Sequence, residues 1–302
     1  MNIVAFFDGR PGHEKQTRGI LNALTELCPL RVQEVYLPRH SCLQNMLMSG
    51  DASLFADADL LLGTGTATHA PMLAAGWRHR LPVVTAMAPD WLWRRAFALC
   101  FVPRHDGVKE AKNIFPTIGP PTLLTDQGKH EAGRGLILVG GADAKSHIWH
   151  DREIAAAVGD ILTREKDISW HVSSSPRTPA ATETALARLG EQLPNCRFFP
   201  YKETAPGWVE DEYHTSGQVW VSADSISMVY EALSAGCAVG LIPVSWRKPG
   251  NKFQRSIDYL AEHAFIRLLA DWRTGNRPQP PPPLAEARRC AEEIVRRWCR
   301  KN

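Results

Sequence analysis

Short, continuously apolar runs alternate with helical patterns along most of this 302-residue chain. The runs are rich in Val, Ile, Leu and Phe and do not alternate with polar residues. Such strands are typical of parallel sheets that helices cover on both faces. The pattern therefore predicts an α/β protein. The predicted strands are Asn2–Phe7, Val32–Leu37, Leu60–Gly63, Pro82–Ala86, Phe97–Val102, Gly135–Val139, Ile168–Val172, Arg197–Phe199, Gln218–Val221 and Ala238–Pro243, and the helical patterns include Glu14–Leu27, Pro71–Trp77, Asp151–Arg164 and Pro179–Gln192.

A polar, glycine-bearing stretch without periodicity, Thr125–Arg134, divides the pattern near its middle. Each side carries about five predicted strands and enough apolar residues for a core of its own. We expect two facing, doubly wound Rossmann-like domains, residues 1–127 and 135–275, followed by a polyproline spacer and a basic helix at 276–302. Because such sheets bind ligands beyond the carboxyl ends of their strands, the cleft between the domains is the expected site.

The composition excludes several other classes of protein. A net charge of +3 is too weak to indicate nucleic acid as a partner. No stretch approaches the roughly 18 apolar residues that cross a bilayer, and the N-terminus lacks the pattern of a signal peptide. The 7 cysteines form no CxxC pair and mostly lie in apolar runs, as reduced core cysteines do. We therefore expect a cytoplasmic protein.

The segment Val221–Ala232 carries the strongest functional signal. A helix is predicted to begin there, directly after a strand, with Asp224 or Ser225 as its N-cap. Unpaired backbone N–H groups and small hydroxyls at such a start suit a phosphate. Glu231 follows about two turns later, where it could accept hydrogen bonds from a nucleotide ribose. The alternative is a capped helix with a solvated glutamate.

Three more loops of the second half could meet a diphosphate. The pair Gly140–Gly141 follows a strand and could offer backbone amides. The loop Ser173–Thr178 supplies hydroxyls and a guanidinium, and Lys252 or Arg255 could neutralise phosphate charge. Each signal is weak alone, but all lie at strand or helix ends of one domain. The predicted donor-binding residues are Gly140, Gly141, Ser173, Ser174, Asp224, Ser225, Ser227, Met228, Glu231, Lys252 and Arg255.

The loop after the first strand, Asp8–Gln16, holds the candidate catalytic residues. His13 lies near a predicted helix start and could deprotonate an acceptor hydroxyl. Asp8 is a second candidate base, or the partner that orients His13; alternatively, His13 only orders the loop. The third predicted strand ends in a turn of small residues at 63–69, and the fifth ends in a loop that contains Arg104 and His105. The predicted acceptor-side residues are Gly12, Gly65, Thr66, Arg104 and His105.

The triplet Asp57–Asp59 spells a DxD, a metal-binding pattern of one class of glycosyltransferase. It precedes a strand, so it lies at the wrong edge of the sheet for a ligand site. We therefore expect no catalytic metal.

Two segments mix apolar and basic side chains. Trp91–Phe97 combines aromatics with arginines, which suits a lipid interface, a partner surface or half-buried packing. A helix from Leu284 to about Trp298 carries an apolar stripe among arginines. It either packs back on the domains or places its basic face on anionic lipid headgroups. Peripheral contact with the cytoplasmic face of the inner membrane is thus one expectation.

Several motifs together resemble the bacterial relatives of the plant elongated-mitochondria fission factor. The resemblance implies the GT-B fold of glycosyltransferases, with a nucleotide-sugar in the C-terminal domain. It further implies that Glu231 holds the donor ribose and that His13 is similar to the histidine of the peptidoglycan lipid-II synthase. The diphosphate would meet Gly140, Gly141, Ser225 and Ser227. The motifs are Asp8–His13, Val102–Asp106, Val139–Gly141, Ser175–Pro179, Ala223–Val229 and Lys252–Phe253.

These observations predict a glycosyltransferase that moves a sugar from a nucleotide-sugar to a hydroxyl of a cell-envelope glycan or lipid-linked acceptor such as lipopolysaccharide. It would need no metal ion and no further cofactor. One alternative is a nucleotide-sugar epimerase or hydrolase, which needs no acceptor. Another is a non-catalytic protein that recruits a partner.

Overall fold

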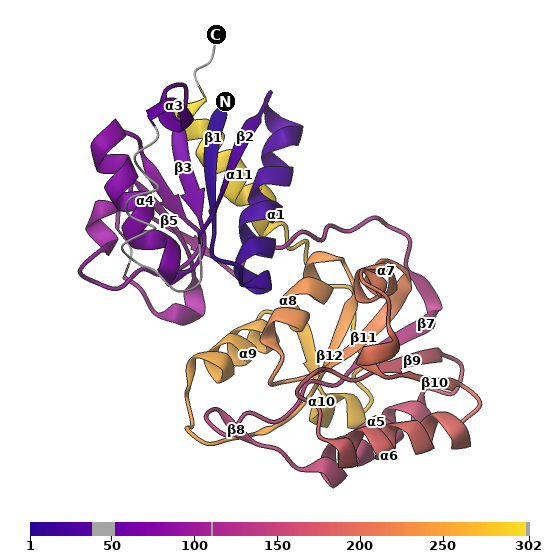
Figure 1. The fold of residues 1–302 in the computed structure, drawn as a ribbon. Coiled ribbons are helices and arrows are strands. Elements are labelled where there is room, and N and C mark those ends of the chain that lie inside the picture. The colour runs from indigo at the N-terminus through magenta and orange to yellow at the C-terminus, as the bar shows by residue number, and fades with distance from the viewer. Residues whose placement is uncertain (38–51, 110, 300–302) are drawn as a thin grey trace. The chain divides into compact units, whose positions relative to one another are not determined.

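The computed structural model describes residues 1–37, 52–109 and 111–299. The chain forms two compact α/β units (Figure 1). The first comprises Met1–Leu123 together with Ala285–Asn302, and the second comprises Leu124–Leu284. The final helix therefore belongs to the first unit, whereas the sequence predicted a separate C-terminal segment.

The first unit contains a parallel sheet of six strands in the order β2-β1-β3-β4-β5-β6. The chain moves from β1 outward to β2 and then returns to β3, so the strand order reverses between β1 and β3. Its strands are β1 (Asn2–Phe7), β2 (Arg31–Tyr36), β3 (Leu60–Gly63), β4 (Val83–Thr85), β5 (Leu99–Pro103) and β6 (Ile114–Thr117); its helices are α1 (Pro11–Leu27), α3 (Ala52–Phe55), α4 (Thr66–His79) and α11 (Glu286–Trp298).

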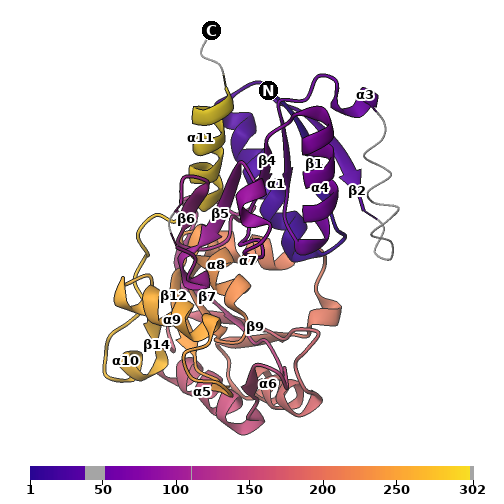
Figure 2. The ribbon, with the colours of Figure 1, turned by 90° about the vertical axis from the view of Figure 1, so that its left-hand side faces the viewer.

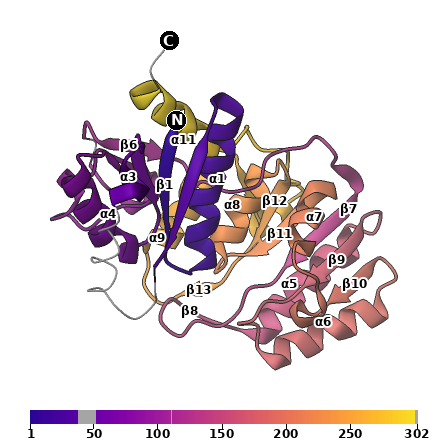
Figure 3. The ribbon, with the colours of Figure 1, turned by 45° about the horizontal axis from the view of Figure 1, so that its top comes forward.

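The second unit contains another parallel sheet of six strands, in the order β10-β9-β7-β11-β12-β14. Here the order reverses between β7 and β11. Helices α5 and α6 cover one face of this sheet, and α7 and α8 cover the other (Figures 1 and 3). The elements are β7 (Glu131–Leu138), β8 (His147–Ile148), α5 (Asp151–Arg164), β9 (Ser169–Ser173), α6 (Ala180–Gln192), β10 (Cys196–Phe199), α7 (Trp208–Thr215), β11 (Ser216–Ser222), α8 (Ile226–Ser234), β12 (Ala238–Ile242), β13 (Ser245–Trp246), α9 (Lys252–Glu262), β14 (Ile266–Leu268) and α10 (Leu269–Arg273).

Alternate residues of β1 face two separate cores. Ile3 and Ala5 pack with α1 and α11, whereas Val4 and Phe6 pack with α4 on the opposite face. Figure 2 shows α11 and α4 on opposite sides of the sheet. This two-sided burial explains why β1 is continuously apolar after Asn2.

The predicted α/β architecture is confirmed, and each of the ten predicted strands is present. Asn2–Phe7 and Leu60–Gly63 have the predicted ends, and the others are shifted at one or both ends. Each sheet nevertheless has six strands, because β6 and β14 were missed. Both are short edge strands, and β6 contains Pro116, which only an edge strand tolerates. Helix α4 begins at Thr66, earlier than predicted, and contains Pro71 in its interior.

Helix α11 packs its apolar stripe into the core of the first unit. Cys290, Ala291 and Ile294 are fully buried there against α1 and β1. Its arginines are largely paired with glutamates of the same helix, as in Arg289–Glu286 at 2.8 Å. Arg296 and Arg297 both contact Glu293, and Arg288 contacts Glu26 and Glu292. The structure therefore favours the packing interpretation of the tail over a basic face presented to lipid.

Four of the six described cysteines are buried, and Cys28 and Cys299 are partly buried. Burial raises the pKa of the Cys100 and Cys237 thiols to about 12. Cys42 lies outside the described residues. No helix in the part of the chain that the structure describes is long and apolar enough to cross a bilayer.

Candidate functional site

Both sheets gather predicted site residues at the point where their strand order reverses. In the first unit, β1 leads into Asp8 and β3 leads into Thr64 and Gly65. In the second, β7 leads into the Gly140–Gly141 turn and β11 leads into Asp224. Open parallel sheets bind ligands at such reversals, beyond the carboxyl ends of the strands. Topology therefore brings the residues of each unit together.

Asp8 and His13 form a hydrogen-bonded pair in the first unit. His13 Nδ1 lies 2.8 Å from Asp8 Oδ2, and the Asp8 side chain is only 2% exposed. The other carboxylate oxygen accepts the Arg10 N–H at 3.1 Å. A carboxylate only accepts hydrogen bonds, so Nδ1 of a neutral His13 carries the proton and Nε2 carries the lone pair. A histidine held in this way by a carboxylate has the geometry that a general base requires.

Gly65 is held against this pair in a conformation that favours glycine, with φ of 109°. A Cβ atom at this position would lie 2.4 Å from His13 Nδ1 and 2.5 Å from Asp8 Oδ2. The Gly65 N–H donates to Met87 Sδ at 3.1 Å, which fixes the turn from the neighbouring strand. Gly65 therefore permits the close approach that builds the pair.

The other predicted acceptor-side residues divide into two groups. Gly12 and Thr66 are exposed beside the pair, at the starts of α1 and α4. Arg104 and His105 follow β5, which lies two strands from β3, roughly 10 Å across the sheet. The charge of Arg104 instead acts on Glu286 at the start of α11. The structure does not bring Arg104 and His105 to the His13–Asp8 pair.

His69 is a buried imidazole near the pair that the sequence analysis did not assign. It lies in the first turn of α4, is 6% exposed, and has its ring edge against Phe97. Burial lowers its pKa to about 4; the charge of Asp90 opposes this shift and that of His13 adds to it. Its Nε2 has no hydrogen-bond partner among the described residues. His69 is therefore neutral at neutral pH.

The buried His69 should make the stability of the protein depend on pH. Its folded pKa of about 4 lies below the ordinary value of 6.5, so the unfolded state binds more protons between these two values. The free energy of unfolding should fall as the pH drops from 7 to 4, by up to about 3 kcal/mol from this residue. Urea unfolding of the wild type and of His69→Phe across this range measures the contribution.

The His69→Phe variant should lack that part of the pH dependence. His150→Phe, which changes an exposed histidine before α5, should retain it. Identical pH profiles for the wild type and His69→Phe would contradict the burial of this imidazole.

Asp224 fixes the conformation of the turn at Gly140 and Gly141 in the second unit, which we call the glycine turn. Its side chain is 1% exposed, and Oδ2 accepts the Gly141 N–H at 3.0 Å and Arg177 Nη2 at 2.8 Å. Oδ1 accepts the Ser222 hydroxyl at 2.6 Å, and the Gly140 N–H donates to Ser222 Oγ at 2.7 Å. The amides of Gly140 and Gly141 are therefore engaged within the protein. Their contact with a diphosphate stays a prediction.

The start of α8 is another candidate anion-binding site of the second unit. Ser225 occupies the N-cap position without capping the helix, because its hydroxyl donates to Asp224 Oδ2 at 3.1 Å. Ser227 is exposed in the first turn, and the half-exposed Arg177 side chain reaches the same place through Asp224. A helix start and a guanidinium together suit an anion. The guanidinium of this loop was named from the sequence as a candidate diphosphate contact, although Arg177 was not included among the predicted donor-binding residues.

Met228 and Glu231 continue along α8, and both are half-buried. The Tyr213 hydroxyl donates to the Met228 carbonyl oxygen at 3.2 Å. Burial, and next the charge of Glu231, raises the pKa of Tyr213. Glu231 therefore lies beside the Tyr213 ring, about one and a half turns into the helix.

Ser173 and Ser174 were predicted to contact the donor. In the structure, both hydroxyls donate hydrogen bonds within the protein. The Ser173 hydroxyl donates to the Phe199 carbonyl oxygen at 2.8 Å, and the Ser174 hydroxyl donates to Glu183 Oε1 at 2.6 Å. Both residues are buried. Their hydroxyls brace the loops around β9 and β10, and their contact with a nucleotide stays a prediction.

Lys252 and Arg255 are exposed in the first turn of α9. The hydroxyls of Tyr230 and Ser256 are 2.7 Å apart and join α9 to α8. The two cations thus begin a helix that packs against the one carrying Glu231.

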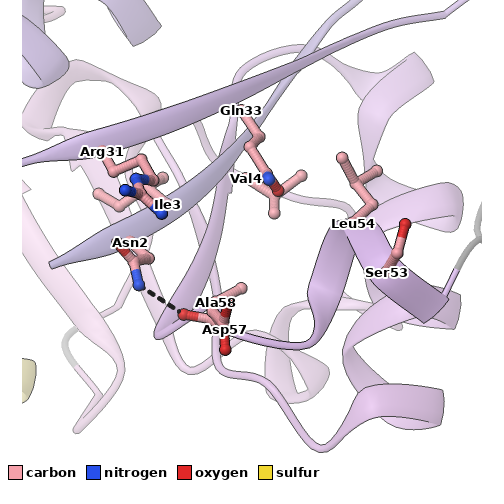
Figure 4. A pocket seen from close by; sticks show the side chains of 9 residues that line it. All are labelled: Asn2, Ile3, Val4, Arg31, Gln33, Ser53, Leu54, Asp57 and Ala58. Carbon is pink, nitrogen blue, oxygen red and sulfur yellow. Dashed lines mark hydrogen bonds between the residues drawn. The ribbon is translucent and has the colours of Figure 1, made fainter.

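The DxD triplet lies at the opposite edge of the first sheet. The Asn2 N–H donates to Asp59 Oδ2 at 2.7 Å, and the Asn2 amide donates to the Asp57 carbonyl oxygen at 2.8 Å. Figure 4 shows Asn2 and Asp57 in a small pocket where β1 begins. The triplet therefore anchors a strand start. Among residues 1–37, 52–109 and 111–299, no group of three or more His, Cys, Asp or Glu side chains is placed to hold a metal ion.

Comparison with known proteins identifies a family and a fold. The sequence model of the family described as mitochondrial fission ELM1 matches residues 11–298. No curated protein matches the chain. The chain is similar to the solved structures of a putative UDP-N-acetylglucosamine 2-epimerase from Listeria monocytogenes (12% identity, 97% of this chain and 94% of that one, TM-score 0.65), MurG from Acinetobacter baumannii (13%, 99% and 99%, 0.59) and a glycosyltransferase from Rickettsia africae (10%, 100% and 99%, 0.55). At these identities the similarity shows the fold, and the predicted GT-B-type fold is confirmed.

Proposed function

This chain belongs to the mitochondrial fission ELM1 family, and on this premise we propose that it is a nucleotide-sugar-dependent glycosyltransferase. Its acceptor is a hydroxyl of a cell-envelope glycan or of a lipid-linked sugar. The second unit binds the donor, and the first unit binds the acceptor. The GT-B-type fold and its glycosyltransferase neighbours support an enzyme.

The observation that carries the proposal is the His13–Asp8 pair at the strand reversal of the first sheet. His13 Nε2 takes the proton of the acceptor hydroxyl while its oxygen bonds to the anomeric carbon of the donor. The bond between that carbon and the diphosphate breaks, and the electron pair leaves with the diphosphate. Asp8 keeps His13 in the required tautomer and stabilises the imidazolium that forms.

Groups around α8 serve the donor in this proposal. The start of α8 and the Arg177 guanidinium face the negative charge that grows on the leaving diphosphate, with Lys252 or Arg255 adding to them. Glu231 accepts hydrogen bonds from the ribose hydroxyls. These cations supply the positive charge, so the proposal requires no metal ion. The name of the Listeria neighbour, which specifies a UDP-sugar, supports a donor of this class.

A thermal-shift screen with UDP, GDP, CMP, TDP, ADP and their sugar conjugates tests donor binding. A ligand at about 100 times its Kd should stabilise the protein by about 2.7 kcal/mol. Glu231→Ala should weaken binding roughly tenfold or more, because the ribose loses a charged acceptor. Glu262→Ala, which removes an exposed carboxylate from the last turn of α9, should bind as the wild type does.

The products separate the proposal from its alternatives. Incubation with the donor found by the screen, with and without an envelope glycolipid fraction, should yield a glycosylated acceptor and free nucleoside diphosphate. A free sugar or an isomer formed without acceptor would indicate an epimerase or hydrolase. No shift with any nucleotide would sink the enzyme proposal and favour a partner-recruiting protein.

A further inference from the structure

The loop at residues 90–95 of the first unit exposes three consecutive large apolar side chains. Trp91 is 75% exposed, Leu92 is 68% exposed and Trp93 is 47% exposed. Contiguous exposed apolar surface of this kind marks a site of interaction with a protein, a ligand or a membrane. We refer to Trp91, Leu92 and Trp93 as the apolar loop.

Hydrogen bonds fix the conformation of the apolar loop. The N–H groups of Trp93 and Arg94 donate to the Asp90 carbonyl oxygen at 3.0 and 3.1 Å. The Asn113 side-chain amide donates to the carbonyl oxygens of Arg94 and Phe97, at 2.8 and 3.0 Å. Phe97 itself is buried against the His69 ring. The turn is therefore anchored on both sides while its apolar side chains remain in solvent.

Exposed cations lie directly after the apolar loop and in the segment before Asn113. Arg95 follows it and is exposed, and Lys109 and Lys112 are exposed in the segment that leads to Asn113. Asp90 is the carboxylate within the loop. Indole rings prefer the boundary between headgroups and acyl chains, and basic side chains beside them attract anionic lipids. This charge pattern fits an anionic bilayer surface.

The segment that carries the apolar loop also contacts the His13 site through Met87. Met87, which accepts the Gly65 N–H through its sulfur, lies a few residues before it on the same segment that follows β4. The other candidate for lipid contact, α11, has its apolar stripe buried and its arginines largely paired with glutamates. The apolar loop therefore combines exposed apolar side chains with exposed cations, whereas the apolar side chains of α11 are buried.

We propose that the apolar loop docks the first unit on an anionic lipid bilayer. Trp91, Leu92 and Trp93 enter the interfacial region, and the neighbouring cations contact lipid phosphates. Docking places the His13–Asp8 pair beside a membrane, where a lipid-linked acceptor would be presented. The lipid contact itself does not depend on sugar transfer.

Sedimentation with vesicles tests the proposal on the full-length chain without nucleotide or glycan. The protein should sediment with phosphatidylcholine vesicles that contain phosphatidylglycerol, and much less with phosphatidylcholine alone. The triple variant Trp91→Ser, Leu92→Ser, Trp93→Ser should bind at least about tenfold more weakly, since each apolar side chain adds to interfacial affinity. Trp77→Ser, which removes an 87% exposed tryptophan from α4, should bind as the wild type does.

A second measurement distinguishes loss of lipid binding from misfolding of a variant. Tryptophan emission should shift to shorter wavelength when anionic vesicles are added, in the wild type and in Trp77→Ser. The single variant Trp91→Ser should show a smaller shift while unfolding in urea at the wild-type midpoint. Absent sedimentation, or equal binding by Trp77→Ser and the triple variant, would overturn the proposal. So would a dimer in analytical ultracentrifugation that the triple variant abolishes, because a second copy would then occupy the surface.

Discussion

The His13→Ala variant is expected to transfer sugar roughly 100- to 10,000-fold more slowly, which is the usual loss when a general base is removed. Its affinity for the donor nucleotide should not change, because His13 lies in the first unit and the predicted donor groups lie in the second. Steady-state rates at saturating donor and acceptor, combined with a nucleotide titration, measure both quantities. A loss in kcat without a loss in donor affinity is the expected signature.

Two further variants sharpen this experiment. Asp8→Asn keeps an oxygen acceptor near His13 Nδ1 but removes the charge that stabilises the imidazolium, so it should also lower kcat. His79→Ala changes a histidine in the last turn of α4, at the other edge of the sheet, and should leave kcat unchanged. If His13→Ala transferred sugar at the wild-type rate, His13 would not be the base, and its bond to Asp8 would only order the loop.

The His13–Asp8 pair was predictable from local sequence. Buried strands read as continuous apolar runs, and the polar residues that follow them must lie at the carboxyl edge of the sheet. Asp8 ends the first such run, and α1 begins at Pro11, which places His13 in the first turn of that helix. Both residues were therefore expected at one loop, and the structure joins them at 2.8 Å.

The roles of the glycine-turn amides were not predictable in the same way. The Gly141 amide is taken by Asp224, a residue 83 positions later in the chain. Nothing in either local segment specifies that contact, because it depends on β7 and β11 being neighbours in register. The same holds for His69, whose low pKa arises from burial beneath elements that follow it in sequence. Local patterns identify polar groups at strand ends, whereas tertiary packing decides which of them remain available to a ligand.

Gly141→Ala is expected to lower the free energy of unfolding of the second unit by about 3 kcal/mol, the upper range for overpacking a closed site. A Cβ atom there would lie 2.0 Å from the Arg177 carbonyl oxygen and 2.4 Å from the Thr178 nitrogen. These are backbone atoms, so no side-chain rotation relieves the contact. One loop must move, which breaks the Ala142 N–H bond to Arg177 O and the Gly141 N–H bond to Asp224.

The same displacement should weaken nucleotide binding, because Arg177 and the start of α8 are held together through Asp224. Gly159→Ala is the matched control: this glycine lies within α5, and its Cβ would meet Leu189 of α6 at 3.5 Å, an ordinary contact distance. Removing a glycine from a helix interior should raise the free energy of unfolding by roughly 0.5–1 kcal/mol. Urea unfolding and nucleotide titration of both variants measure these opposite effects. If Gly141→Ala unfolded and bound nucleotide as the wild type does, the glycine turn would not be the scaffold of the donor site.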